Sequence, residues 1–181
     1  MSRKYKFANP EGVYFVSFAT VQWVDVFTRR CYKDILVESI NYCVDNKGLK
    51  IYAWVIMSNH VHCLIQKTEE SLEYILRDLK KFSSKAILKE IDENQQESRK
   101  SWMLWIFERA GEKNSNDSHY QFWQQQNQPV ELTTTQEIEQ KIDYIHNNPV
   151  MAGFVNNPED YPYSSAVDFA GGEGLVKLEP M

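Results

Sequence analysis

Residues 49–66 read LKIYAWVIMSNHVHCLIQ, and this stretch decides the fold. Two short apolar runs, 49–57 and 60–66, are separated only by Ser58-Asn59. Both runs are rich in β-branched and aromatic residues, which favour strands. A two-residue connection that contains Asn, which tolerates positive φ, is typical of a tight β-hairpin. The stretch therefore predicts two antiparallel strands in the middle of the chain.

A strand and a helix are expected before this hairpin. Residues 13–20 are rich in aromatic and β-branched side chains, which indicates a strand. Thr28 then caps a helix whose apolar residues repeat at helical spacing, and Gly48 ends it. Because a hairpin stands among interleaved helices and strands, we expect a largely antiparallel sheet and the α+β class.

Two more helices are expected after the hairpin. The first covers roughly residues 71–90, and its buried stripe is expected to consist of Leu72, Ile75, Leu76, Leu79, Phe82 and Ala86. The second begins at Thr134, where Glu137 three residues later completes a capping-box pattern. This helix is expected to stop before Pro149, because the residue before a proline disfavours helical backbone.

The bulk composition is that of a globular chain. Its 181 residues, 43% hydrophobic and 13% aromatic, suffice for a buried core and predict a single domain over 1–181. That domain is expected to carry a polar insertion around 92–118 and an irregular, turn-rich tail from Val150. Residues 121–128, which are rich in glutamine around Trp123, are expected to form an edge strand.

Cysteine content, hydropathy and net charge indicate in which cellular compartment the protein works and which binding partners it can have. Cys31, Cys43 and Cys63 are far apart and odd in number, which indicates reduced thiols and not a disulfide framework or a zinc site. No apolar run reaches the ~20 residues of a membrane span, and no signal-peptide pattern follows the basic start. We therefore expect a cytoplasmic protein without a membrane partner. The net charge of −5 does not by itself favour nucleic acid, so such a partner requires a local basic patch.

Two of the four histidines, His60 and His62, flank Val61 at the start of the second hairpin strand. On a strand, residues i and i+2 project from the same face roughly 7 Å apart, so the two imidazoles lie side by side. Such a pair suits a divalent metal and forms half of a site. The alternative is two half-exposed histidines on a sheet face. A histidine-triad nucleotide hydrolase needs a third histidine where Leu64 stands, so the nucleophile of that chemistry is absent.

The third helix brings a tyrosine and an amide together. At about 100° per residue, one flanking face of this helix carries Glu137, Lys141, Tyr144 and Asn148. Tyr144 and Asn148 are one turn apart and therefore neighbours. This pair fits a tyrosine nucleophile beside a metal, with Asn148 as a third ligand and Tyr144 attacking a phosphate that the metal polarises. The alternative is a half-buried packing tyrosine, with Asn148 merely at the end of the helix.

Two motifs in this order resemble a known family. Residues 58–63, SNHVHC, resemble the HUH motif (histidine, hydrophobic, histidine) of single-tyrosine transposases. Residues 143–150, DYIHNNPV, with GFV at 153–155, resemble the tyrosine helix of their REP-associated relatives. Segments within 158–166 resemble that family's C-terminal part, so the resemblance runs from the first strand to about Phe169.

The resemblance implies a ferredoxin-like antiparallel sheet flanked by helices, with the HUH motif on a central hairpin strand and Mg²⁺ or Mn²⁺ at the histidines. It also implies nicking and strand transfer of single-stranded DNA through a covalent 5′-phosphotyrosine that frees a 3′-hydroxyl. By position, His60 and His62 match the metal ligands and Tyr144 matches the nucleophile. Asn148 matches a polar residue that is often glutamine in the family. The insertion at 92–118 and the acidic balance depart from the simplest members.

The expected partner is single-stranded or hairpin DNA. We expect it to contact the N-terminal arm, the basic face of the second helix and one aromatic stacking platform. The residues concerned are Arg3, Lys4, Lys6, Arg77, Lys80, Lys81, Lys85, Lys89 and Trp123. For the helix residues, the alternative is a solvated face.

Two other functions stay open at this point. One is a domesticated nuclease of the same fold that processes repeats in its host genome. The other is a DNA- or RNA-binding module without catalysis. The sequence also leaves open whether a homodimer forms and whether Tyr144 acts in its own subunit or in a partner.

Overall fold

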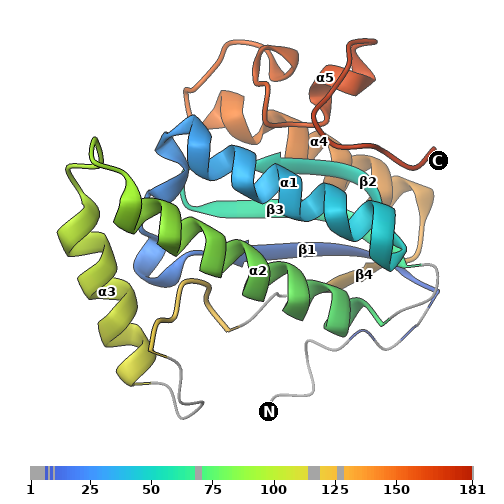
Figure 1. Ribbon diagram of the computed structural model, residues 1–181. Coiled ribbons are helices and arrows are strands. Elements are labelled where there is room, and N and C mark those ends of the chain that lie inside the picture. Colours follow the sequence, from blue (N-terminus) through green and yellow to red (C-terminus); the bar gives the residue numbers. More distant parts are fainter. Residues whose placement is uncertain are drawn as a thin grey trace.

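The computed structural model describes residues 7, 9, 11–67, 71–113, 119–125 and 129–180 (Figure 1). Its strands are β1 (Val13–Ala19), β2 (Leu49–Ile56), β3 (His60–Lys67) and β4 (Val130–Leu132). Its α-helices are α1 (Arg30–Lys47), α2 (Leu72–Glu93), α3 (Lys100–Glu112), α4 (Thr135–Met151) and α5 (Ala166–Phe169). Three short 3₁₀ helices are η1 (Val21–Trp23), η2 (Val26–Thr28) and η3 (Pro158–Asp160).

The four strands form one antiparallel sheet in the order β2-β3-β1-β4. Along the chain, β1 leads through α1 to the β2-β3 hairpin, and β4 follows after α2 and α3. This strand order and connectivity are those of a ferredoxin-like sheet, so the predicted α+β fold is confirmed. The central position of β3, between β2 and β1, is confirmed as well.

Helices cover both faces of the sheet, and the side-chain alternation of the strands explains why. In Figure 1, α1 and α2 run across one face, while α4 lies behind the sheet. Phe18 and its cross-strand partner Val61 face the α2 side, where Lys80 lies over the Phe18 ring. Residues at the alternate positions, His62 among them, face α4. The sheet thus has two buried layers, and the histidine motif belongs to the α4 layer.

The predicted tight hairpin is confirmed. The Met57 N–H donates to the His60 carbonyl at 2.8 Å, which closes the turn around Ser58 and Asn59. Neither central residue has positive φ. Within the described ranges, the only non-glycine residues with positive φ are Gln22 and Trp23.

The ends of two helices differ from the predictions. Arg29, and not Thr28, is the N-cap of α1, although Gly48 ends this helix in left-handed backbone as predicted (φ 66°). The capping box of α4 is confirmed at Thr134, but the helix continues through Pro149 to Met151. A proline in the last turn removes a single backbone donor, and the Ala152 N–H still donates to the Asn148 carbonyl at 3.0 Å.

The region between α2 and β4 was predicted least well. The polar insertion contains α3, whose buried residues Met103 and Phe107 are one helical turn apart. Phe82 on α2, predicted to be buried, is 59% exposed. In the described part of 121–128, Trp123 forms one isolated bridge to Thr20, so the edge strand predicted there is wrong. The edge strand on that side of the sheet is β4.

The tail after α4 lies along the outer edge of β2. Its backbone N–H groups at Ser165 and Glu179 donate to the carbonyls of Trp54 and Ile51. In the other direction, the Ile56 N–H donates to the Tyr163 carbonyl at 3.0 Å. The irregular tail therefore covers a strand edge that would otherwise be open to pairing.

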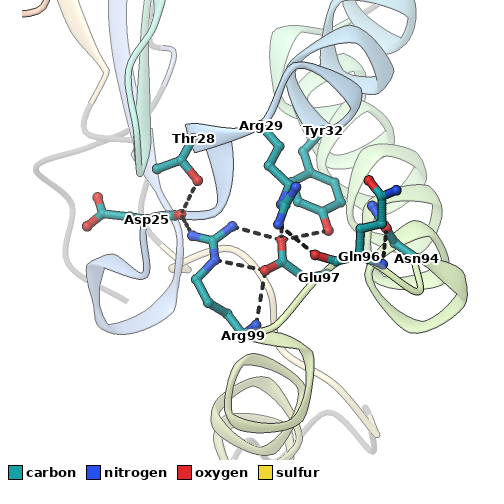
Figure 2. Close-up of polar contacts among 8 residues, drawn as sticks. All are labelled: Asp25, Thr28, Arg29, Tyr32, Asn94, Gln96, Glu97 and Arg99. Atoms are coloured by element: carbon teal, nitrogen blue, oxygen red, sulfur yellow. Dashed lines mark hydrogen bonds and ion pairs between the residues drawn. The ribbon is translucent and has the colours of Figure 1, made fainter.

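A buried carboxylate joins the turn before α3 to the start of α1, as Figure 2 shows. Glu97 Oε2 accepts hydrogen bonds from Arg29 Nε at 2.9 Å and from the Tyr32 hydroxyl at 3.0 Å. Arg99 Nε and Nη2 donate to the two carboxylate oxygens, each at 2.9 Å. We call Glu97, Arg29, Arg99 and Tyr32 the Glu97 cluster.

Two expectations on bulk properties can be compared with this structure. Among the described residues, Cys31, Cys43 and Cys63 take part in no disulfide. Among the described residues, no helix has the length and apolarity that a membrane crossing requires.

Candidate active site

The histidine pair lies on the face of β3 that is turned toward α4. The rings of His60 and His62 are side by side, with centroids 4.7 Å apart. Val61 and Cys63 point to the opposite face and are buried there, at 0% and 3% exposure. The predicted alternation along β3 is therefore confirmed.

Helix α4 places Tyr144 against this pair. The Tyr144 hydroxyl lies 3.5 Å from His62 Nε2, a long hydrogen-bond contact, and the two ring centroids are 5.2 Å apart. Tyr144 is 48% exposed, so solvent or a substrate can reach it. The tyrosine and both histidines belong to the same chain, so one subunit brings all three together.

An aromatic residue and a lysine complete the surroundings of the tyrosine. The Phe15 ring is stacked on His62, with centroids 5.3 Å apart, and meets Tyr144 edge to face at 5.9 Å. Lys141 lies one turn before Tyr144, and its Nζ is 4.5 Å from the Phe15 ring centroid and 5.3 Å from that of Tyr144. A positive charge thus lies over the Tyr144 ring.

The residue before the motif fixes the orientation of His60. His60 Nδ1 is 2.7 Å from Asn59 Oδ1. The Asn59 amide nitrogen donates to the Trp23 carbonyl and to Asp25 Oδ1, which leaves its oxygen as the acceptor. His60 Nδ1 therefore carries the proton, and Nε2 holds the lone pair that a metal would use.

Both imidazoles are held neutral, which is the form that binds metal. Burial lowers the pKa of His60. Burial also lowers the pKa of His62 to about 3, and the positive charges of His60 and Lys141 add to this effect. His62 Nδ1 is buried and has no hydrogen-bond partner. An unpaired buried nitrogen of this kind is uncommon in a purely structural core and more frequent at functional sites.

The donor set fits half of a divalent-cation site. Imidazole suits divalent transition metals, whereas Mg²⁺ and Mn²⁺ prefer oxygen ligands, so the expected Mg²⁺ or Mn²⁺ would also require oxygen donors beside the two histidines. In the described ranges, no third His, Cys, Asp or Glu joins them into a metal-binding group. Asn148 is half-buried on α4, one turn after Tyr144, and its amide oxygen as a third ligand stays a prediction.

The other tyrosines of the tail are engaged elsewhere. The Tyr161 hydroxyl donates to the Ile56 carbonyl at 2.8 Å, and burial raises its pKa to about 12. The Tyr163 hydroxyl donates to Asp34 at 2.7 Å. Of the tyrosines that the structure describes, Tyr144 is the one whose hydroxyl contacts the histidine pair.

The predicted DNA-binding residues do not gather around this site. Arg3, Lys4 and Lys6 lie outside the described residues. Trp123 is 6% exposed, stacked on Phe27 and bonded to Ser83, so it is a core residue and cannot stack on a base; this prediction is corrected.

The basic face of α2 also needs correction. Lys80 is turned inward, and its Nζ donates to the Gln124 carbonyl at 2.7 Å, so it does not belong to the exposed face. The exposed stripe consists of Arg77, Lys81, Lys85 and Lys89. It lies on the helical layer opposite α4, so the sheet separates it from Tyr144 (Figure 1).

The geometry can now be compared with known proteins. The profile of the family described as "Transposase IS200 like" matches residues 14–108, which include both histidines. The chain belongs to the IS200-like transposase family. The matched segment ends before α4, so the family match itself does not include Tyr144. No curated protein gives a significant match.

One solved structure shares this fold over almost its whole length. The structure of a REP-associated tyrosine transposase bound to a REP hairpin matches with a TM-score of 0.63 and 21% identity, over 99% of this chain and 93% of that one. A putative transposase from Deinococcus radiodurans R1 matches with a TM-score of 0.44 and 20% identity, over 81% and 97% of the two chains. The first likeness shows that the IS200-like fold extends over nearly the whole chain.

Four residues that contact the candidate site were not predicted from the sequence to belong to it. They are Phe15, Trp23, Asn59 and Lys141. Lys141 shares the predicted helix face of Tyr144, so its charge was a usable signal. Phe15 and Trp23 come from the β1 end of the chain, and only the pairing of β1 with β3 brings them near the motif.

Proposed function

We propose that this transposase-family protein nicks and rejoins single-stranded DNA at hairpin-forming sequences, with Tyr144 as the nucleophile. The contact of 3.5 Å between the Tyr144 hydroxyl and His62 Nε2 carries the proposal. It brings a half-exposed phenol to two neutral imidazoles on a scaffold of the IS200-like fold. A phenol is a weak nucleophile at neutral pH, so it requires such a neighbourhood.

His60, His62 and Asn148 would hold a divalent cation, Mg²⁺ or Mn²⁺. When bound, the cation neutralises negative charge on the scissile phosphate and so favours attack on phosphorus. The chain's own part is to hold both imidazoles neutral and oriented. Asn59 fixes His60, and burial against Phe15 fixes His62.

In the proposed reaction, the Tyr144 oxygen attacks phosphorus and the bond from phosphorus to the 3′-oxygen breaks. The phosphate stays on Tyr144 as a 5′-phosphotyrosine, the phenol loses its proton, and the leaving 3′-oxygen gains one. Attack by a 3′-hydroxyl reverses these steps and rejoins a strand. Lys141, which lies over the Tyr144 ring, would add a positive charge next to the phosphate.

Covalent capture tests this proposal. Purified protein is incubated with Mn²⁺ and end-labelled oligonucleotides that combine a hairpin with a randomised single-stranded flank, and adducts are mapped by mass spectrometry. We expect a DNA adduct on Tyr144, a free 3′-hydroxyl, and loss of both in EDTA. Tyr144→Phe keeps the ring and removes one hydroxyl, so it should abolish the adduct.

A matched control is Tyr74→Phe, since Tyr74 is 52% exposed and lies on α2 in the other layer. It should form as much adduct as the wild type. An adduct that persists in Tyr144→Phe would contradict the assignment. Binding without any adduct would instead favour a catalytically inactive DNA-binding module. Cleavage without rejoining would favour a domesticated, repeat-processing nuclease.

A further inference from the structure

The turn between β1 and α1 holds an exposed aromatic ring on a strained backbone. Gln22 and Trp23 have φ values of 52° and 55°, in the left-handed region that side chains rarely adopt. Two such residues in succession, one of them a tryptophan, cost free energy and persist only where the surroundings impose them. Strain of this kind concentrates at functional sites.

The bonds that hold this conformation involve Thr20 and Asn59, the residue before the histidine motif. The Trp23 N–H donates to the Thr20 carbonyl at 3.1 Å, and the Trp23 carbonyl accepts from the Asn59 side chain at 3.1 Å. The Asn59 carbonyl accepts from the Thr20 N–H at 2.9 Å. Because Asn59 also orients His60, the same residue fixes the turn and the metal-binding ring.

The strained turn presents Trp23 at the margin of the site. Its ring lies edge to face with His60, with centroids 5.8 Å apart and an interplanar angle of 72°. Even so, the residue is 55% exposed. A solitary exposed aromatic residue needs no functional explanation. Here, however, a strained backbone holds the ring beside the histidine pair.

A polar hollow continues the surface beyond Trp23. It has a volume of about 300 Å³ and is lined in part by Gln22, Arg109, Lys113, Gln121, Gln124 and Gln125. The two cations, Arg109 and Lys113, suit phosphate. Gln22 immediately precedes Trp23 in the chain, so the hollow adjoins the Trp23 turn.

We propose that Trp23 is the stacking platform for the unpaired base next to the scissile phosphate. This inference rests on the proposed DNA cleavage and deepens it, since it names the residue that positions the strand. Stacking is tolerant of sequence because every base has a π-face, and it is a common means of holding single strands. The adjoining hollow then receives the following nucleotide.

The test measures affinity in the Tyr144→Phe background, where no strand is cut. The probes are an oligonucleotide that the wild type cleaves, the same strand with one abasic site at each position in turn, and 20-nucleotide oligothymidylate. Trp23→Ala should weaken binding of the intact strand by roughly 5- to 150-fold, the range found for stacking on one aromatic side chain. Trp23→Gly removes the ring and tolerates positive φ, so it should weaken binding equally in a well-folded protein.

The abasic series distinguishes stacking from a general weakening of binding. Removal of the base beside the cleavage point should weaken binding to Tyr144→Phe but cause no further weakening once Trp23 is replaced. Phe82→Ala is the control, because Phe82 is 59% exposed and lies on α2. It should leave the position dependence unchanged.

Three results decide between the inference and the function on which it rests. Unchanged affinity of both Trp23 variants for either strand, or additive effects of Trp23 replacement and the abasic site, would overturn the stacking role alone. Wild-type protein that neither cleaves nor binds any strand would overturn the proposed function. Weaker binding of oligothymidylate by both Trp23 variants, even without cleavage, would support the platform.

Discussion

The Glu97 cluster and the histidine pair are two polar groups in the same small protein, and they are satisfied very differently. The Glu97 side chain is fully buried, yet it accepts hydrogen bonds from Arg99, Arg29 and Tyr32. The bonds from Arg99 are the main reason that its pKa falls to about 2. His62 is also buried, but its Nδ1 has no partner and its pKa falls to about 3 because burial disfavours the cation.

The difference indicates what each group is for. A charge with complete partners, which joins α1 to the turn before α3, stabilises the fold. A pair of imidazoles in which the buried His62 Nδ1 has no partner, with an exposed tyrosine beside it, contributes little to the stability of the fold. Substitutions in the Glu97 cluster should therefore lower the stability of the fold, whereas substitutions in the histidine pair should lower activity.

The largest expected effect is on cleavage, from the histidine pair. His60→Ala or His62→Ala removes a proposed metal ligand and should lower the rate of oligonucleotide cleavage by roughly 10³-fold or more, since metal stabilisation of a phosphoryl transition state is worth several kcal/mol. His60 is only half-buried, so His60→Ala should change the free energy of unfolding by no more than about 1 kcal/mol. Cleavage rates and urea unfolding measure the two effects.

His119→Ala is the matched control, because this histidine is exposed and pairs with Glu108 away from the site. It should alter neither cleavage nor stability. Full activity of His62→Ala, or full activity of the wild type in excess chelator, would contradict the role of the histidines as metal ligands.

The next effect is on stability, from the Glu97 cluster. Glu97→Ala leaves two arginines and the Tyr32 hydroxyl without their acceptor and should cost about 3 kcal/mol. Glu93→Ala removes a carboxylate from an exposed pair, 3.8 Å from Lys89, and should cost no more than about 0.5 kcal/mol. Urea unfolding of both variants gives the comparison. Equal values for the two would contradict the structural role of the cluster.

The same cluster predicts acid sensitivity. Because the folded-state pKa of Glu97 lies at about 2, below the ordinary 4.5, its ionised form stabilises the fold fully above pH 4.5. This contribution is lost as the pH falls from about 4.5 to about 2, because in that range the unfolded chain binds a proton at Glu97 and the folded protein does not. Glu97→Gln should flatten that part of the curve of unfolding free energy against pH. An unchanged slope would show that other carboxylates dominate.

The sequence was sufficient wherever periodicity or a local motif determines the structure. The β2-β3 hairpin, the alternation of His60 and His62 with Val61, and the Thr134 capping box follow from neighbours along the chain. Contacts between distant segments did not follow. The pairing of Trp123 with Thr20 and the burial of Lys80 depend on how 119–125 folds back over α2, which no local pattern encodes.

The candidate active site also combines features that the sequence predicts with features that only the structure shows. The roles suggested for Tyr144 and the histidines came from two motifs, and the fold confirms only that they meet. The strained turn at Trp23 left no trace in the sequence, because neither Gln22 nor Trp23 is a residue type that favours positive φ. Only the structure shows that bonds from Thr20 and Asn59 hold it.

The smallest expected effect concerns the salt dependence of DNA binding, and it compares the two helical layers. Removal of one lysine that binds a phosphate should lower the slope of log affinity against log salt by roughly 0.7 for a single strand. Lys141 lies beside Tyr144, whereas Lys81 and Lys85 lie on α2, across the sheet from it. For a strand of about ten nucleotides that lies in the site, the slope should therefore fall by this amount in Lys141→Ala. It should stay unchanged in the α2 double variant, which combines Lys81→Ala and Lys85→Ala.

The α2 stripe can contribute only if a longer hairpin wraps around the edge of the sheet. Binding titrations of both variants, with the short strand and with a hairpin, measure this difference. A lower slope for the short strand in the α2 double variant would mean that DNA enters from the α2 side, and the path across His60 and Trp23 would then be wrong.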